Sequence, residues 1–268
     1  MGGQTIAFFA VLAGILGLCF GSFLNVVVYR VPRKESIVHP PSRCPNCGHQ
    51  LTAVENIPVL SWVFQGGKCR SCKAPISPGY LVGEVATAGL WVGAVLRFPH
   101  SATLAILYAA LFWVLLALSL IDLKHKLLPN AIVYPATVAG VAALALSAAI
   151  LGHPGWIVWA LAGGAVSFVF FLAIALISPA GMGMGDVKLS FLLGTALAFL
   201  WATPGGFWRP VVAGFFLAFL SGAIVGIALM AAGKAGRKSA VPFGPFMALG
   251  TVVTILWTTE VVRLLPSV

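Results

Sequence analysis

Residues 103–121 read TLAILYAALFWVLLALSLI, and no charged side chain interrupts them. An apolar run of this length can cross the hydrocarbon core of a bilayer as a helix. Seven other segments have the same character, so the chain is predicted to form about eight transmembrane helices. The eight segments are roughly 6–28, 81–98, 103–121, 131–151, 156–177, 187–202, 210–232 and 243–265. The predicted fold class is an all-α polytopic membrane protein.

The composition supports this prediction. Hydrophobic residues make up 60% of the chain and charged residues only 8%, which excludes an ordinary soluble domain. The chain has 30 glycines, and runs such as Ala162–Ala165 would let membrane helices approach closely. The first segment lacks a basic region and a cleavage site, so we expect a retained helix rather than a cleaved signal peptide.

The basic residues are distributed unevenly. With the amino terminus outside, the outer side holds only Arg97, Arg209 and Arg263, and the inner side holds the other thirteen. The inner set is Arg30, Arg33, Lys34, Arg43, Lys68, Arg70, Lys73, Lys124, Lys126, Lys188, Lys234, Arg237 and Lys238. This bias fixes the predicted orientation, and it explains the net charge of +10 by topology and attraction to anionic lipid. No basic face interleaved with aromatic residues occurs, so nucleic acid is not an expected partner.

The polar insert 30–80 carries four cysteines in two knuckles. They are Cys44-Pro45-Asn46-Cys47 and Cys69-Arg70-Ser71-Cys72, separated by 21 residues. Paired CxxC knuckles at this spacing predict a tetrahedral structural zinc site, with free thiols as the alternative. The metal would staple a small cytoplasmic module that lacks a large apolar core. Cys19, alone in the first helix, is interpreted as a small apolar filler.

The domain organisation follows from these segments. We expect a first transmembrane helix over 1–29, a zinc-bound cytoplasmic domain over 30–80, and a seven-helix transmembrane domain over 81–268.

Asp122 and Asp186 are the only aspartates in the chain, and each borders an apolar segment. The predicted topology puts both on the cytoplasmic side. Ionisable groups at such positions usually face a polar cavity or a partner, so we interpret the pair as a candidate catalytic site. The alternatives are a helix-capping role for Asp186 and a solvated helix end for Asp122. Gly183 and Gly185 interrupt the helical pattern and would let a substrate backbone approach.

Several motifs together resemble the type IV prepilin peptidases, membrane aspartic proteases of the GxGD class. The resemblance spans nearly the whole chain in the expected order. It rests on Gly21–Arg30, the two CxxC knuckles, Glu55–Trp62, Asp122 with Pro129-Asn130, Gly183–Lys188 and Pro242–Phe246.

The resemblance implies an activity and a location. A member of this family would cleave the basic leader from type IV prepilins or type II secretion pseudopilins, after a glycine, at the cytoplasmic face of the bacterial inner membrane. Members with the cysteine module would then methylate the new amino terminus with S-adenosylmethionine. Asp122 and Asp186 would be the catalytic pair. Glu35, Glu55 and Glu84 could attract the leader or simply pair with nearby basic residues.

The positions of the aspartates suggest separate roles. Asp122 is expected at the carboxyl end of a helix and Asp186 near an amino end, which favours a protonated Asp122 and an ionised Asp186 as base. Two other functions stay open from the residues alone. One is an ion-coupled transporter, since aspartates and broken helices also build ion sites. The other is a non-catalytic zinc-stapled scaffold for pilus assembly.

Overall fold

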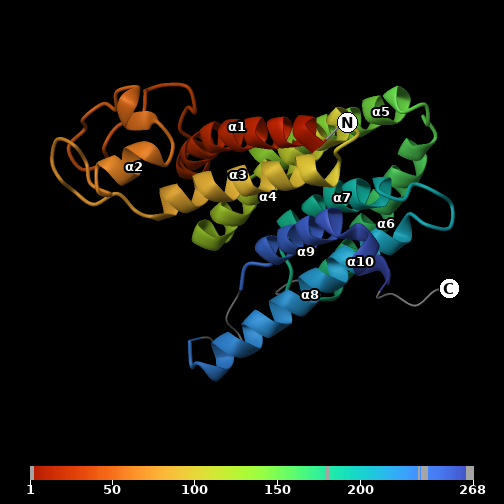
Figure 1. Cartoon of the computed structure of the whole chain (residues 1–268). Helices are drawn as coiled ribbons and strands as arrows, with labels where there is room; N and C mark the ends of the chain where they lie inside the picture. Colours follow the sequence, from red (N-terminus) through yellow and green to blue (C-terminus); the bar gives the residue numbers. More distant parts are fainter. Residues whose placement is uncertain (1–2, 179–180, 235, 237–240, 264–268) are drawn as a thin grey trace. The chain divides into compact units, whose positions relative to one another are not determined.

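The computed structural model describes residues 3–178, 181–234, 236 and 241–263 (Figure 1). Arg237 and Lys238, counted among the inner charges, lie outside these ranges. All regular elements of the described residues are helical. They are α1 Gly3–Arg30, η1 Val31–Arg33, η2 Val54–Asn56, α2 Leu60–Phe64, α3 Gly79–Arg97, α4 Ala102–His125, α5 Asn130–Ile150, α6 Trp156–Ile177, α7 Met184–Phe199, α8 Trp208–Ala231, α9 Gly244–Leu256 and α10 Thr258–Arg263. The all-α membrane fold predicted from the sequence is confirmed.

Six helices of the described residues are long and apolar enough to cross a membrane: α1, α3, α4, α5, α6 and α8. The expected number of eight is not confirmed, because the segments predicted over 187–202 and 243–265 form shorter helices. The helix α7 has 16 residues, and at 1.5 Å per residue it is about 24 Å long, less than the hydrocarbon thickness. The last segment is divided at Trp257 into α9 and α10.

The chain forms two compact units, Met1–Ala117 and Leu118–Val268. In the first unit, α1 and α3 run side by side (Figure 1). A Cβ atom added to Gly17 would stand 2.6 Å from the Ala88 Cα, and one added to Gly21 would stand 2.5 Å from the Glu84 Cα. Two glycines four residues apart therefore let the backbones of α1 and α3 touch, as in other close membrane helix pairs.

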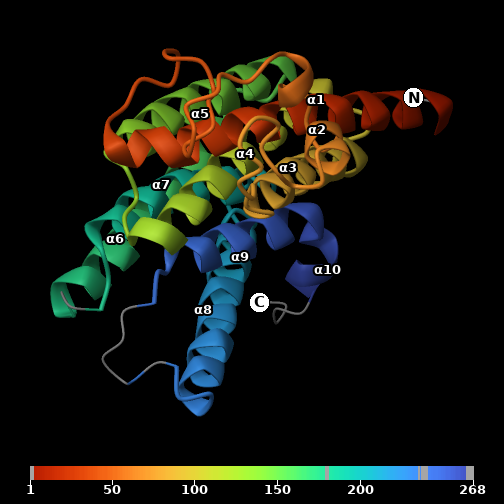
Figure 2. The ribbon, with the colours of Figure 1, turned by 90° about the vertical axis from the view of Figure 1, so that its left-hand side faces the viewer.

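The second unit is built around α7. Nearly every residue of α7 from Asp186 onward is buried, and α6 packs along it (Figure 2). Cβ atoms added to Gly163 and Gly164 of α6 would collide with Ala198 and Thr195 of α7. The residues of α7 are apolar because they are buried among other helices. An apolar helix packed in this way need not be long enough to cross the membrane.

Candidate active site and metal centre

Asp122 and Asp186 both belong to the second unit, and both are buried. Asp122 lies in the last turn of α4, which ends at His125, and Asp186 is the third residue of α7. Their relative exposures are 5% and 8%. The helix ends therefore agree with the sequence-based expectation for both residues.

Neighbouring residues show that the two aspartates converge. Gly244, the first residue of α9, donates its backbone N–H to Asp122 Oδ2 at 3.1 Å. A Cβ atom on Gly185 would stand 2.9 Å from the Leu128 Cβ, and one on Gly244 would stand 3.3 Å from the Leu128 Cδ2. Leu128 thus touches both the residue before Asp186 and the residue that binds Asp122. The two carboxyl groups are also close enough to interact electrostatically.

The glycines before Asp186 have different surroundings. Packing explains the glycine at position 185, since a side chain there would displace Leu128. Gly183 has φ −77° and ψ 145°, a conformation open to any residue, and a Cβ there would make only an ordinary 3.4 Å contact with Asp186 Oδ2. The role of both glycines in substrate approach remains a prediction.

A polar contact joins α5 to α7 beside this site. The Lys188 ammonium donates to Asn130 Oδ1 at 3.1 Å and lies 5.2 Å from the centroid of the Tyr134 ring. Lys188 and Asn130 both belong to motifs on which the family resemblance rests. The contact holds the first turn of α7, which carries Asp186, against the start of α5.

Phe243 is a packing residue. Its ring centroid lies 5.0 Å from that of Phe219 and 6.4 Å from that of Phe246. This aromatic cluster supports the start of α9, and hence the Gly244 N–H that binds Asp122. Sequence reasoning did not single out Gly244, although its place in the motif Pro242–Phe246 was a signal.

The four cysteines of the first unit form one cluster. Their sulfur atoms all lie within 4.8 Å of one another, with 3.8 Å between Cys44 and Cys72 and 3.9 Å between Cys47 and Cys69. These separations are far too long for disulfides, whose sulfurs are about 2.05 Å apart. The cluster could therefore hold one metal ion, as the knuckle spacing predicted.

The two knuckles repeat one set of backbone hydrogen bonds. Cys44 N–H donates to the His49 carbonyl, and Gly48 N–H donates to the Cys44 carbonyl. Cys69 and Lys73 make the equivalent bonds in the second knuckle, where the Cys69 acceptor is Ala74. Gly48 has φ 73° and Lys73 has φ 60°, so a lysine occupies the left-handed position that glycine fills in the first knuckle.

The surroundings of Cys72 favour the thiolate form of its side chain. The backbone N–H of Ala74 and the side-chain amide of Asn46 donate to the Cys72 sulfur and lower its pKa to about 6. Metal ions bind the thiolate form of cysteine, so these donors favour metal binding.

Glu55 closes the loop that follows the first knuckle. Its carboxylate accepts hydrogen bonds from the Thr52 N–H and hydroxyl, both at 2.9 Å, and contacts His49 Nε2 at 3.2 Å. The Thr52 N–H and hydroxyl, followed by His49, lower the pKa of Glu55 to about 2. Of the two alternatives for Glu55, pairing with a lysine or arginine is not found among the described residues, because Thr52 and His49 occupy the carboxylate.

Glu84 on α3 also has a structural partner. Its Oε2 accepts the Val59 N–H at 2.7 Å, and the side chain is buried. Sequence reasoning placed Glu84 near the inner face but did not foresee this contact. A buried acid within a membrane helix was the available signal.

Two protein families match successive parts of the chain. Residues 15–98 match the Bacterial Peptidase A24 N-terminal domain, and residues 109–227 match the Type IV leader peptidase family. The chain is 35% identical to the Prepilin leader peptidase/N-methyltransferase of Pseudomonas putida, over 95% of this chain and 93% of that protein. Its identity to the protein of the same name from Dichelobacter nodosus is 35%, over 94% and 92%.

A third relative of the same name, from Myxococcus xanthus, is 39% identical over 86% of this chain and 66% of its own length. No solved structure matches the chain. The two family matches cover successive parts of the chain, one over the glutamates and cysteines of the first unit and the other over both aspartates. The chain therefore belongs to the type IV leader peptidase family.

Proposed function

We propose that this protein cleaves the leader from prepilins or pseudopilins, after a glycine, with Asp122 and Asp186 as its catalytic residues. The observation that carries the proposal is the convergence of these two buried carboxyl groups around Leu128. The names of the relatives supply the substrate class. Nothing in the described residues or the comparisons favours the transporter or the scaffold.

The cleavage needs one ionised and one protonated carboxyl group. The ionised group takes a proton from water, whose oxygen attacks the glycyl carbonyl carbon. The protonated group donates to the carbonyl oxygen. The C–N bond then breaks, and the leaving nitrogen takes a proton to become an amine. Two carboxylates this close do not both ionise cheaply, so the pair should share one proton.

The Gly244 contact supports a different assignment of roles from the one expected. The helix-end argument favours Asp186 as the base, by about 0.3–1 kcal/mol. The N–H of Gly244 stabilises an ionised Asp122 by a charge-assisted hydrogen bond, worth about 1.5–3 kcal/mol. The Gly183 N–H also favours an ionised Asp186, but only the Gly244 contact has the geometry of a hydrogen bond, at 3.1 Å. We therefore assign the base to Asp122 and the proton to Asp186.

The relatives' names also support methylation of the new amino terminus. S-adenosylmethionine would supply a methyl group on a positively charged sulfur. The amine nitrogen forms the new N–C bond as the C–S bond breaks, the bonding pair stays on sulfur, and the amine gives up a proton.

We assign zinc to the cysteine cluster, in a structural role. Four sulfurs about 2.3 Å from one tetrahedral ion are about 3.8 Å apart, close to the 3.8 and 3.9 Å separations between the knuckles. Four cysteines fill the coordination sphere and leave no position for a substrate. The metal would fold the module.

The membrane setting follows from the charge distribution. We propose a multi-pass protein of the bacterial inner membrane, with the two aspartates and the cysteine module on the cytoplasmic side. The strong bias of lysine and arginine toward one set of loops supports this orientation. A basic leader would remain on that side while the hydrophobic part of the prepilin stays in the bilayer.

Replacing each catalytic carboxyl group by an amide tests the proposal. A prepilin is incubated with the protein in proteoliposomes, and mass spectrometry follows the loss of the leader and the gain of a methyl group. Asp122→Asn and Asp186→Asn should each abolish cleavage, since the amide neither accepts nor shares the proton. Glu260→Gln, which removes an exposed carboxylate to which no role is assigned, should cleave at the normal rate. Normal cleavage by either aspartate variant would refute the proposal.

A further inference from the structure

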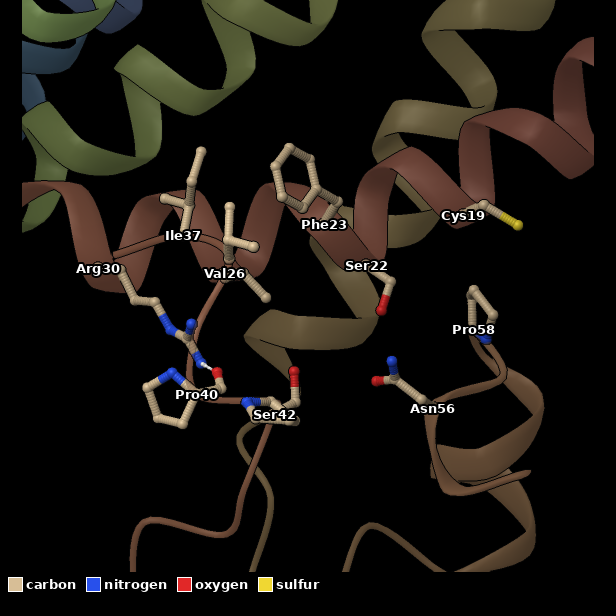
Figure 3. A pocket seen from close by; sticks show the side chains of 12 residues that line it. Cys19, Ser22, Phe23, Val26, Arg30, Ile37, Pro40, Ser42, Asn56 and Pro58 are labelled. Carbon is tan, nitrogen blue, oxygen red and sulfur yellow. Dashed lines mark hydrogen bonds between the residues drawn. The ribbon is translucent and has the colours of Figure 1, made fainter. Parts of the chain in front are cut away.

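A pocket of about 350 Å³ lies in the first unit between α1 and the loops that follow it (Figure 3). This volume is at the lower end of the range for small-molecule sites. Its lining combines apolar and polar side chains, among them Ser22, Phe23, Val26, Arg30, Ser42 and Asn56. None of these residues belongs to the proteolytic site, so the pocket is available for another ligand.

Arg30 gives the pocket a fixed positive charge. The side chain is buried, and its guanidinium donates to the carbonyls of Ser36 at 2.9 Å and Pro40 at 2.7 Å. Figure 3 shows the hydrogen bond from Arg30 to the Pro40 carbonyl. Among the described residues no carboxylate pairs with Arg30. A guanidinium has five N–H donors in a planar fork that suits a carboxylate, so donors remain for an acidic ligand group.

The wall of the pocket that includes Asn56 and Pro58 is followed by a strained turn. Val59 has φ 62° and ψ −55°, and the Leu60 N–H donates to the Pro58 carbonyl at 2.6 Å, which makes a γ-turn of the rarer hand. A β-branched residue in this conformation is unusual and strained. The Glu84 carboxylate holds the turn by accepting the Val59 N–H. The turn begins two residues after Asn56, whose side chain points toward Ser22 in Figure 3.

We propose that this pocket binds the methyl donor, S-adenosylmethionine. The inference rests on the methylation half of the proposed function. Arg30 would bind the carboxylate of the donor, and Ser22, Ser42 and Asn56 would bind its hydroxyl groups and adenine edge. Phe23 is stacked on Trp113 and lines the pocket, and an aromatic ring attracts a sulfonium charge.

The test measures binding of S-adenosylhomocysteine to the purified full-length protein by calorimetry. Val26→Trp fills the pocket and should weaken binding at least 100-fold. Asn56→Ala removes hydrogen bonds worth about 1–1.5 kcal/mol and should weaken it about 5- to 10-fold. Ile15→Trp, at an exposed position of α1, and Gln50→Ala, at an exposed position of the module, are the matched controls and should bind normally.

Each variant is also checked for its bound metal and its unfolding midpoint, so that lost binding is not mistaken for lost folding. If Val26→Trp binds the probe normally while the wild type methylates prepilin, the pocket assignment is overturned and the proposed function stands. If the wild type cleaves prepilin but neither binds the probe nor methylates, the methylation half fails and this inference with it. Loss of co-purified phospholipid in Val26→Trp, with normal probe binding, would show a lipid headgroup site instead and overturn the assignment.

Discussion

The substitution Gly244→Ala tests whether the Gly244 N–H sets the charge of the catalytic pair. A Cβ atom at this position would stand 2.8 Å from Asp122 Oδ2, which is too close for a normal contact. The atom in conflict is the end of a side chain, so Asp122 can rotate away while the fold persists. Rotation breaks the hydrogen bond from the Gly244 N–H.

The size of the effect follows from that bond. A hydrogen bond to a charged group is worth about 1.5–3 kcal/mol, and each 1.36 kcal/mol changes a rate about tenfold. We therefore expect kcat for leader cleavage to fall about 10- to 150-fold. KM should change little, because the lost contact lies between two groups of the enzyme.

The assay is steady-state cleavage of a prepilin in proteoliposomes, with kcat and KM measured separately. Gly226→Ala is the matched control, because a Cβ at that glycine of α8 meets nothing within 4 Å. Alanine is also a better helix former than glycine, so this control should fold and cleave normally. A Gly244→Ala enzyme with the wild-type kcat would refute the idea that this N–H supports catalysis.

Three further predictions concern the first unit. Lys73→Gly should raise the stability of the cysteine module by about 1 kcal/mol, because the left-handed conformation costs a residue with a side chain about 1–2 kcal/mol. The measurement is the chelator concentration at which half of the module is unfolded, and an unchanged concentration would contradict the prediction. Glu84→Ala should leave the Val59 N–H without its acceptor. Its hydrogen exchange should then become about 5- to 150-fold faster, from a loss of about 1–3 kcal/mol; unchanged exchange would show that the turn does not depend on Glu84. The donors around Glu55, the Thr52 N–H foremost, lower its pKa to about 2 in the folded state. The ionised Glu55 should therefore stabilise the fold fully above about pH 4.5, and this stabilisation should disappear as the pH falls toward 2. Acid titration of Glu55→Gln should lack this part of the transition, and identical curves for the two proteins would disprove it.

The sequence predicted the helices well, because membrane helices depend on local composition. An apolar run must satisfy its own backbone hydrogen bonds in lipid, so its ends can be read from the residues. The expected segment 131–151 is helix Asn130–Ile150, and 156–177 is Trp156–Ile177. The cysteine cluster was predictable for a similar reason, since each knuckle is a local turn.

The spanning status of the last helices was not predictable in the same way. The sequence of α7 is as apolar as that of a spanning helix, but its residues are buried against α6 and other helices. Hydropathy does not distinguish a lipid-facing residue from one packed in the bundle. The end of α9 at Trp257 likewise has no clear signal in the apolar run that contains it.

The amino-acid sequence by itself determined the helical membrane class, the two cysteine knuckles and the two candidate aspartates. Only the tertiary structure placed Gly244 against Asp122, Leu128 between two glycines, and Glu84 on the strained turn at Val59. Each of these contacts joins residues far apart in the chain, and each depends on how helices pack. Composition and spacing describe neighbours along the chain, whereas the chemistry depends on neighbours in space.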